Sequence, residues 1–473
     1  MDKFYHSVRL NPELCRGCIN CIKRCPTQAI RVRNGKAQIN KKFCIDCGEC
    51  IRVCQYHAKH ATYDKLEVLK QYEYTVALPA PSLYSQFNNL DDINIVLNAL
   101  LLMGFDDVVE VSAAAELISE ATRTYLETHE ECFPVISTAC SSVVRLIRVR
   151  FPNLIPHLLP LNPPIEVAAI MAVKKAMEET GLPREKIGII FISPCPSKVT
   201  YAKAPLGIEK SEVDHVLAIK DVYSQLLPFM KAVDAEPDEI STSGKIGISW
   251  GRSGGEASGL FTENCLAADG IENVIRVLED LEDQKFAQLK FIELNACNGG
   301  CVGGVLTVEN PYVAEAKLKR LRKYLPVARS HMDMQKIPEG HVGWTKEIEY
   351  EPVFNLGNNM LESFSRLNQA ERLCKRLPGL DCGSCGAPTC KALAEDIVRG
   401  EAREEDCVYY LRDNLHRLSQ EITTLAQDLA DDGTTGKTDS QENLKVLTEY
   451  IQRISDEILI LDTKMKSTKQ EGT

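Results

Sequence analysis

Two groups of four cysteines near the start of the chain have the spacing of iron–sulfur ligands. The stretches CRGCINCIKRCP and CIDCGECIRVC repeat one pattern of three closely spaced cysteines followed by a fourth. Three such thiolates can wrap three irons of a cubane, while the fourth cysteine points to a second cluster. The pattern therefore predicts two [4Fe-4S] clusters. The expected ligands are Cys15, Cys18, Cys21 and Cys54 for one cluster, and Cys44, Cys47, Cys50 and Cys25 for the other.

Both groups together resemble the bacterial two-cluster ferredoxins. Gln55 departs from that family, in which proline usually follows the last cysteine, and this difference affects a turn rather than a ligand. Paired zinc sites are the alternative, although zinc sites have no need of the triplet spacing. Two clusters alone imply electron relay and not chemistry.

Four more cysteines follow apolar runs in the middle of the chain. PVISTAC ends at Cys140, KIGIIFISPC at Cys195 and LKFIELNAC at Cys297, and Cys301 comes shortly afterwards among glycines. We interpret these runs, with YTVALPAPS and KIGISWGRSGG, as strands. Amphipathic stretches such as IEVAAIMAVKKAMEETG and GIENVIRVLEDLE predict helices between them, so the region reads as α/β. Ligands gather beyond the carboxyl ends of such strands, so these thiolates are expected to converge.

The segments STACSSVV, SPCPSK and ELNACNGGCVGG resemble the three signature loops of [FeFe]-hydrogenases. GFDDVVEVSAAAEL, LPAPS and GRSGGEAS add to the resemblance, which covers about residues 1–365. It implies an H-cluster, in which a [4Fe-4S] cube is bridged by Cys301 to a two-iron unit carrying CO, cyanide and azadithiolate. Cys140, Cys195 and Cys297 would be the other ligands of the cube. Lys198 matches the family lysine that donates a hydrogen bond to cyanide.

The glycines around Cys301 are expected to let a bulky cofactor approach the backbone. They are Gly299, Gly300, Gly303 and Gly304.

Several positions depart from the family pattern. Ala139 replaces a cysteine that relays protons in highly active members, and Ser119 stands where a glutamate of the same path is expected. Ser193 and Asn295 replace methionines beside the two-iron unit, and Ser141 replaces a proline. General acid–base help contributes about 10²–10⁴ in rate, so turnover is expected to be slow. The resemblance is therefore to the sensory branch of the family.

A third cysteine group lies in DCGSCGAPTCKALAEDIVRGEAREEDC. Its members are Cys382, Cys385, Cys390 and Cys407. The pattern resembles the single-cluster module of electron-transport-complex and corrinoid-protein subunits and predicts one more [4Fe-4S] cluster. A zinc site is the alternative. The remaining Cys132, Cys265 and Cys374 are interpreted as small buried apolar residues.

The last part of the chain carries a heptad pattern typical of coiled coils. The first stripe is Leu411, Leu415, Leu418, Ile422, Leu425 and Leu429. After DDGTTGKTDS the second is Leu444, Leu447, Ile451, Ile454, Ile458, Leu461 and Met465. The stripe predicts either a dimer interface or a helix packed on its own domain.

Composition sets the remaining expectations. The chain has 473 residues, of which 19 are cysteines, and a net charge of −11. The charge argues against nucleic acid as a partner. The chain contains no run of about 18 apolar residues, so we do not expect a membrane span. The N-terminus shows no secretory signal, so we expect the protein to be located in the reducing cytoplasm. Its cysteines are then expected to bind metals rather than to form disulfides.

Four regions follow from these patterns. They are a two-cluster ferredoxin-like domain (1–62), an α/β H-cluster domain (70–365), a four-cysteine module (366–410) and a coiled-coil helical tail (411–473).

The leading hypothesis is a low-turnover [FeFe]-hydrogenase that interconverts protons, electrons and H2 and senses hydrogen or redox state. It would hold three [4Fe-4S] clusters plus the H-cluster. It would act with a redox or signalling partner protein, and its coiled-coil tail is a candidate interface for a homodimer. Two alternatives remain. One is a hydrogenase-like iron–sulfur scaffold or assembly protein that lacks the two-iron unit, and the other is an electron-transfer subunit.

Overall fold

The computed structural model describes residues 5–130, 133–233, 237–286, 288–331, 341–353, 356–357, 359–431, 445–446, 448–449, 451–454 and 456. The chain divides into two compact units. The large unit comprises Met1–Arg9, Phe43–Arg52 and His60–Pro352, and the small unit comprises Leu10–Lys42, Val53–Lys59 and Val353–Thr473. The triplet Cys44, Cys47 and Cys50 therefore belongs to the large unit, and the other ferredoxin-like cysteines belong to the small one.

Four parallel strands form one sheet of the large unit. Its order is β6 (Asp107–Val108), β5 (Tyr74–Pro79), β8 (Ile187–Ser193) and β9 (His215–Ala218). Every residue of β8 is buried. A strand covered by helices on both faces needs such a continuous apolar run.

A second parallel sheet holds the other two cysteine-bearing strands. Its order is β10 (Cys265–Asp269), β11 (Phe291–Asn295) and β7 (Val135–Ile136). The predicted strands before these cysteines are confirmed. Cys195 and Cys297 lie two residues after β8 and β11, and Cys140 lies four residues after β7. The α/β interpretation is confirmed as well.

The helices of the large unit cover these sheets. They are α2 (Glu49–Arg52), α3 (Pro81–Tyr84), α4 (Ile93–Met103), α5 (Val111–Thr128), α6 (Ser141–Arg150), α7 (Pro164–Thr180), α8 (Pro196–Lys203), α9 (Ile219–Ala232), α10 (Lys245–Ser249), α11 (Gly255–Ser258), α12 (Ile271–Glu282) and α13 (Pro311–Leu321). The predicted helices at α7 and α12 are confirmed. Proline opens α7, whose C-cap Gly181 is left-handed, and α12 buries Ile271, Val274, Leu278 and Leu281 on one face.

The interpretation of KIGISWGRSGG as a strand is wrong, because Lys245–Ser249 forms α10. Tertiary contacts decide this. The Oε1 atom of Glu116 accepts hydrogen bonds from Gly244 N at 2.7 Å and Gly247 N at 3.2 Å, which orients the first turn. Its Oε2 atom accepts from Arg329 N and Ser330 N, both at 2.9 Å. One buried carboxylate thus joins three separate segments of the large unit.

The small unit contains two cysteine-rich segments and a helical region. β2 (Ile30–Arg33) and β3 (Lys36–Ile39) form an antiparallel hairpin, turned by Asn34 and Gly35 with positive φ. The helices are α1 (Asn20–Lys23), α14 (Met360–Arg376), α15 (Cys390–Val398) and α16 (Val408–Asp431). A core that includes Leu373, Leu377, Leu393 and Cys407 joins the last three. The short strands β1 (Val8–Leu10) and β4 (Lys59–Ala61) form a further two-stranded sheet.

The first half of the predicted coiled coil falls on α16. Leu411 and Leu418 are buried, whereas Leu415 and Ile422 are half-buried. The side chains of Leu425 and Leu429 lie outside the described residues, as do Leu444, Leu447, Ile458, Leu461 and Met465. Of the second stripe only Ile451 and Ile454 are described, and Ile451 is exposed. The coiled coil and the dimer stay predictions.

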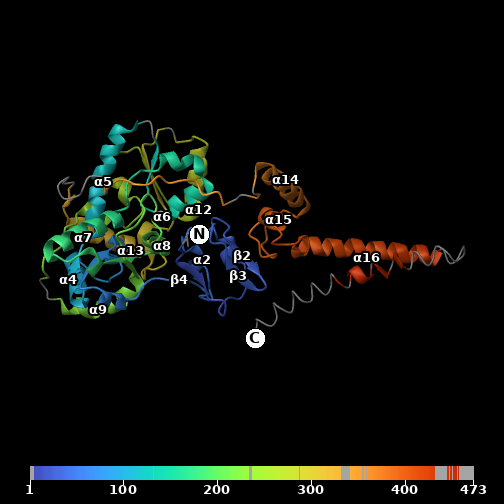
Figure 1. Cartoon of the computed structure of the whole chain (residues 1–473), viewed down its shortest axis with the longest axis horizontal. Coiled ribbons are helices and arrows are strands. Elements are labelled where there is room, and N and C mark those ends of the chain that lie inside the picture. Colours follow the sequence, from blue (N-terminus) through green and yellow to red (C-terminus); the bar gives the residue numbers. More distant parts are fainter. Residues whose placement is uncertain are drawn as a thin grey trace. The chain divides into compact units, whose positions relative to one another are not determined.

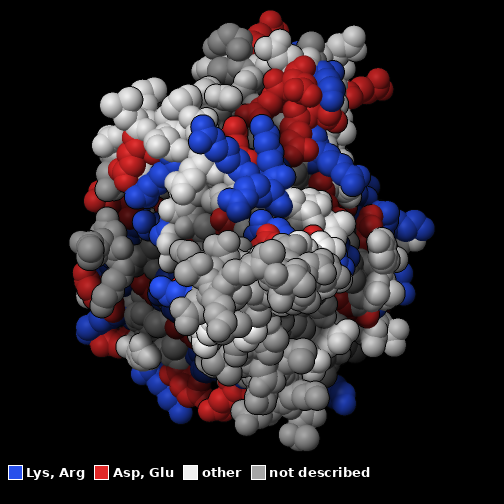
Figure 2. All heavy atoms as spheres, turned by 90° about the vertical axis from the view of Figure 1, so that its right-hand side faces the viewer, with Lys and Arg blue, Asp and Glu red and all other residues white. Residues whose placement is uncertain are grey.

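No described helix is long and apolar enough to cross a bilayer. On the face drawn in Figure 2, Lys and Arg side chains of the described residues lie next to Asp and Glu side chains. The 18 cysteines that the structure describes form no disulfide bond.

Candidate functional site

The four cysteines predicted for the H-cluster lie in three loops of the large unit. Cys140 is the N-cap of α6 and Cys195 is the N-cap of α8. Cys297 follows β11, and Cys301 lies in the short 3₁₀ helix Gly300–Gly303. Two helix N-termini thus face this site, and their partial positive charge favours thiolates and anionic clusters.

The structure brings these four thiols close enough to interact electrostatically. Burial raises the pKa of Cys297 well above the ordinary thiol value, and the other three cysteines raise it further. Burial likewise raises the pKa of Cys195 to about 11, against the opposing charge of Lys198. Four half-buried thiols that repel one another as anions need a positively charged group between them. Iron supplies such charge, so the donor set fits an iron–sulfur cube.

Lys198 lies on α8 beside the four thiols. Its Nζ atom is 3.8 Å from the Sγ atom of Cys301. Burial opposes its charge, but the cysteine thiolates outweigh burial and raise the pKa of the ammonium. Lys198 therefore stays a cation at this site and can donate hydrogen bonds to an anionic ligand.

The glycines near Cys301 serve a different purpose from the one expected. A Cβ atom on Gly300, whose φ is +83°, would lie 2.5 Å from Ser253 N. A Cβ atom on Gly304 would lie 2.2 Å from Pro194 O. These glycines let the Cys301 loop pack against the backbone of two other loops. Contact within the protein, and not only room for a cofactor, requires them.

A cavity of about 50 Å³ opens beside Lys198 and Cys301. Its lining is mostly apolar and includes Phe191, Pro163, Trp250 and Val111. A mostly apolar cavity with few polar groups is the usual form of a cofactor or substrate site. The predicted position of the two-iron unit, next to the bridging cysteine, therefore falls at this cavity.

The predicted departures from the family lie at different places around this cavity. Ala139 and Asn295 line it, as predicted for residues beside the two-iron unit. Ser193 is not among the described lining residues, and its Oγ atom donates to Cys195 O at 2.9 Å. Ser141 shares a hydrogen bond of 2.8 Å with Ser197, and Ser119 accepts from Trp250 Nε1 at 3.0 Å. These serines support turns and packing.

Two buried carboxyl groups that sequence reasoning missed also line the cavity. They are Glu256 on α11 and Glu293 on β11. Glu293 accepts hydrogen bonds from Gly254 N, Ala257 N and Asn295 Nδ2 at 2.8–2.9 Å, which favour its charged form. Among the described residues, Glu256 accepts a hydrogen bond from Ser137 Oγ alone, at 2.6 Å.

Burial and then the charge of Glu293 raise the pKa of Glu256 well above its ordinary value. Burial raises the pKa of Glu293 as well. Like charges this close cannot both persist, so the pair holds one proton and Glu256 is the better position for it. The signal in the sequence was an acid inside the apolar run FIELN, but the pairing is visible only in three dimensions.

The loop Phe43–Arg52, with the second ferredoxin-like triplet, packs against the four-cysteine site of the large unit. Arg52 Nη2 donates to Gly303 O at 2.7 Å, and its charge lowers the pKa of Cys297. A Cβ atom on Gly48 would contact Val305 and Pro196. Ile45 is buried in a core that Cys47 and Cys140 also contact. The second triplet therefore lies next to the predicted H-cluster.

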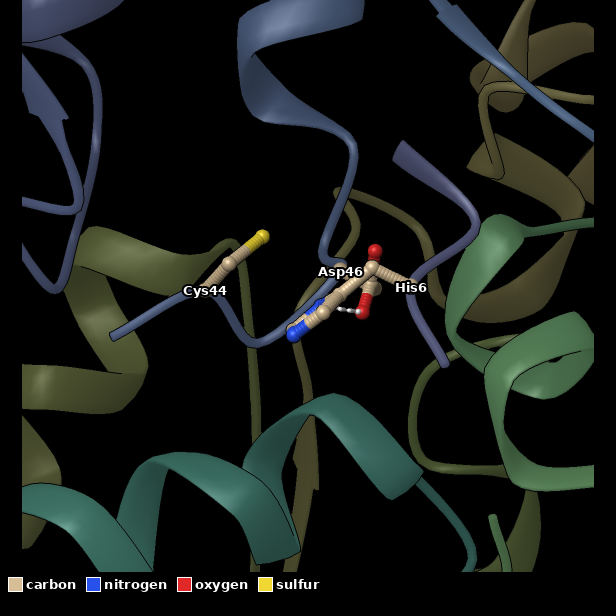
Figure 3. A group of neighbouring side chains, drawn as sticks. All are labelled: His6, Cys44 and Asp46. Carbon is tan, nitrogen blue, oxygen red and sulfur yellow. Dashed lines mark hydrogen bonds and ion pairs between the residues drawn. The ribbon is translucent and has the colours of Figure 1, made fainter. Parts of the chain in front are cut away.

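A buried pair holds this loop to the N-terminal strand (Figure 3). His6 Nδ1 and Asp46 Oδ2 are 2.7 Å apart, and Asp46 Oδ1 accepts from Val8 N at 2.9 Å. Ligand atoms of His6, Asp46 and Cys44 lie within 4.8 Å of one another. Because Cys44 belongs to the triplet spacing, we interpret His6 and Asp46 as a clamp on the loop rather than as an additional metal site.

In the small unit, the structure gathers the cysteines predicted for the first cluster. Burial raises the pKa of Cys21 to about 11, and Cys18, Cys15 and Cys54 add to the increase while Lys59 lowers it. Cys54 is thus near the first triplet although it is distant in sequence. Cys15 Sγ accepts a hydrogen bond from Ala37 N at 3.3 Å, the kind of contact that stabilises a thiolate ligand.

The third cysteine group surrounds one small cavity of about 10 Å³. All four predicted ligands line it, namely Cys382, Cys385, Cys390 and Cys407. Cys390 is the first residue of α15, and Cys407 immediately precedes α16. The group fits one metal centre. Its roles, like those of all the site residues, stay predictions.

Comparisons with known proteins match the same three regions of the chain. A family model for the iron-only hydrogenase large subunit, C-terminal domain, matches residues 73–262 and 256–305. Models for a 4Fe-4S dicluster domain and for an Fe-S cluster match residues 7–55 and 377–409. This chain is a member of an [FeFe]-hydrogenase-like family. It therefore contains iron–sulfur domains of the hydrogenase type.

Individual members of the family are distant from this chain. Iron hydrogenase 1 of Clostridium pasteurianum is 24% identical over 288 residues, which are 49% of this chain and 50% of that protein. The chain thus spans about half the length of this curated relative. The [FeFe]-hydrogenase HydA1 of Chlamydomonas reinhardtii, in a variant form, aligns with a TM-score of 0.47 and 13% identity. That alignment covers 61% of this chain and 98% of the other.

Proposed function

We propose that this [FeFe]-hydrogenase-like chain binds an H-cluster and interconverts protons, electrons and H2 slowly, as a sensor of hydrogen or redox state. The observation that supports it most is the meeting of four thiols and Lys198 beside a mostly apolar cavity that Cys301 lines. When bound, the H-cluster supplies an open iron position for hydrogen chemistry. The protein residues supply ligands, charge, exclusion of water and protons.

Each residue has a distinct role in this proposal. Cys140, Cys195, Cys297 and Cys301 hold the cube, and Lys198 donates to an anionic ligand of the two-iron unit. Phe191, Trp250 and the prolines keep bulk water out of the cavity. Ala139 provides a methyl group where highly active members have a thiol, so protons cannot pass through this position.

The carboxyl pair supplies an alternative source of protons. Burial and then the charge of Glu293 raise the pKa of Glu256 and so favour its protonated form. A proton-holding group that lines the cavity can support turnover without the missing thiol, although less directly. We therefore expect residual hydrogen chemistry rather than none.

Infrared absorption of the full chain, matured with the two-iron cofactor, tests this proposal. We expect CO and cyanide stretches that shift when the sample is exposed to H2. Lys198→Met is expected to move or abolish the cyanide bands, whereas Lys203→Met, on the same helix, is not. Absence of all such bands from a protein with full iron–sulfur content would instead support the scaffold or electron-transfer alternatives.

A further inference from the structure

The third cysteine group lies directly against the loop of the first one, within the small unit. Lys23 Nζ donates to Pro388 O at 3.0 Å and also to Asp381 O. A Cβ atom on Gly383 would lie 3.4 Å from Ile22 Cδ1. Ile22 follows Cys21, and Gly383 follows Cys382, so each side of the contact is one residue from a predicted ligand. Consecutive Cα atoms are about 3.8 Å apart, so the two sites are close neighbours.

A backbone contact joins the same two segments. Val32 N, on β2, donates to Gly386 O at 2.8 Å. A Cβ atom on Gly386 would lie only 1.9 Å from Val32 O, so only glycine permits this approach. Gly386 follows the predicted ligand Cys385. β2 and α15 also lie side by side in Figure 1.

A buried charge cluster fixes the orientation of this contact. The side chain of Asp396 on α15 is only 2% exposed. Arg31 donates to both of its oxygens, at 2.6 Å and 3.0 Å, and Arg33 Nη2 donates to Oδ2 at 2.7 Å. Arg33 Nη1 also donates to Cys385 O at 3.0 Å. Charge-assisted, bidentate hydrogen bonds are strong and directional, so they set the register of the two loops.

The contact uses the ligand loops themselves rather than surfaces remote from them. Purely structural packing of α14–α16 on the hairpin would not require that arrangement. We propose that Arg31, Arg33 and Asp396 hold the third cysteine loop on the first one so that single electrons pass directly between the iron–sulfur groups of the two loops. In each transfer one cluster is oxidised by one electron and the other is reduced by one, and no bond or proton moves.

This proposal rests on the proposed function only in requiring iron–sulfur clusters at both loops. It does not need the two-iron unit. The full chain carrying its [4Fe-4S] clusters and lacking that unit is therefore the proper sample, and the infrared experiment stays independent of the outcome.

Electron paramagnetic resonance of the reduced chain tests the proposal. Cys385→Ala should remove the third cluster. If that cluster interacts with its neighbour, the wild-type spectrum minus the variant spectrum will not equal the signal of one isolated cluster, because the spin–spin interaction between the two clusters is lost as well. Asp396→Asn should lose the same interaction at unchanged iron content. Asp413→Asn, an exposed acid next to Arg412 on α16, is the matched control and should keep it.

Samples frozen rapidly after the addition of less than one electron per chain show how fast that electron redistributes between the clusters. We expect slower redistribution in Asp396→Asn than in the wild type or in Asp413→Asn. A wild-type spectrum that is the simple sum of isolated cluster signals would overturn the proposal. Unchanged spin–spin interaction and unchanged electron redistribution in Asp396→Asn would overturn it as well. Should Asp396→Asn fail to fold, the comparison of the wild type with Cys385→Ala still decides whether the clusters interact.

Discussion

The methyl group of Ala139 faces a cavity in which highly active members of the family carry a thiol. A thiol exchanges protons and a methyl group does not, while both fill similar space. Ala139 therefore separates proton delivery from cofactor binding, and a single substitution can test the two independently.

We expect Ala139→Cys to raise hydrogen turnover by about 10²-fold, at the low end of general acid–base contributions. Hydrogen evolution with a reduced dye measures the rate, and infrared bands confirm equal cofactor loading. Ala80→Cys, a control that adds a thiol elsewhere in the cavity lining, should give no such increase. Equal rates for Ala139→Cys and the wild type at equal loading would contradict the missing-relay explanation.

Glu256 makes the stability of the large unit depend on pH. Its pKa in the folded protein is raised, mainly by burial. Its contribution to stability is therefore complete at a pH below the pKa that Glu256 has in the unfolded chain. That contribution is lost as the pH rises towards the pKa that Glu256 has in the folded protein. Glutamine keeps the shape without this loss.

Glu256→Gln should therefore gain stability relative to the wild type as the pH rises from about 5 to about 8, by up to about 1.4 kcal/mol per pH unit. Chemical denaturation at several pH values measures the difference. The exposed Glu263→Gln variant should show no such trend. A difference that stays constant with pH would mean that Glu256 is ionised throughout.

Sequence patterns predicted the ligands better than the acids. Cysteine spacing is a local property, and strand-end positions follow from the α/β pattern, so the three loops were accessible from the sequence. Lys198 was expected only from the resemblance to [FeFe]-hydrogenases. Glu256 and Glu293 are 37 residues apart, and what makes them a pair is burial in one cavity, which no local pattern encodes.

At the scale of elements, the large unit places the N-termini of α6 and α8 at Cys140 and Cys195. Each helix begins at its cysteine because the preceding strand ends shortly before it. The Cys301 loop is then held by backbone contacts that leave no room for a side chain at Gly304. Positioning of the ligands is thus a matter of close backbone packing.

Gly304→Ala should destabilise the large unit by about 1–3 kcal/mol, as expected for overpacking, and should reduce iron binding at the four-cysteine site. The new Cβ atom would lie 2.2 Å from Pro194 O. Gly343→Ala is the matched control, because its Cβ atom would meet Pro160 O at an ordinary 3.7 Å. Thermal unfolding and iron content measure both effects. Similar behaviour of the two variants would show that the Cys301 loop can move aside.

The helix α10 shows where local patterns fail. KIGIS is apolar and contains two isoleucines, which favours a strand. The close approach of Gly247 to α5, where a Cβ atom would lie 2.0 Å from Ser112 O, and the hydrogen bonds to Glu116 favour a helix instead. Such long-range contacts override a short apolar run.

At the scale of the whole molecule, three cysteine-rich regions are distributed over two compact units. The division passes through the ferredoxin-like segment, because Phe43–Arg52 belongs to the large unit and Leu10–Lys42 to the small one. The sequence analysis assigned residues 1–62 to one domain, because cysteine spacing alone cannot show which hydrophobic core each loop joins. The partners, the tail and the domain boundaries stay predictions.

We expect Cys390→Ala to lower the iron content of the full chain by one cluster and to leave its zinc content unchanged. Cys390 lines the cavity of the third group, whereas Cys374 on α14 only packs against the same core. Cys374→Ala is therefore the control and should keep all its iron. Loss of zinc instead of iron in Cys390→Ala would establish the zinc alternative.

The carboxylate of Glu116 has a consequence for a chain so rich in thiols. By accepting four backbone hydrogen bonds from two distant segments, it cross-links the fold as a covalent sulfur bridge would. Glu166, which accepts from Glu212 N and Ser211 Oγ, acts in the same way. Hydrogen-bonded links of this kind do not react with thiols or with reductants. Changes of ambient potential can therefore act on the metal centres while the scaffold that holds them stays tied.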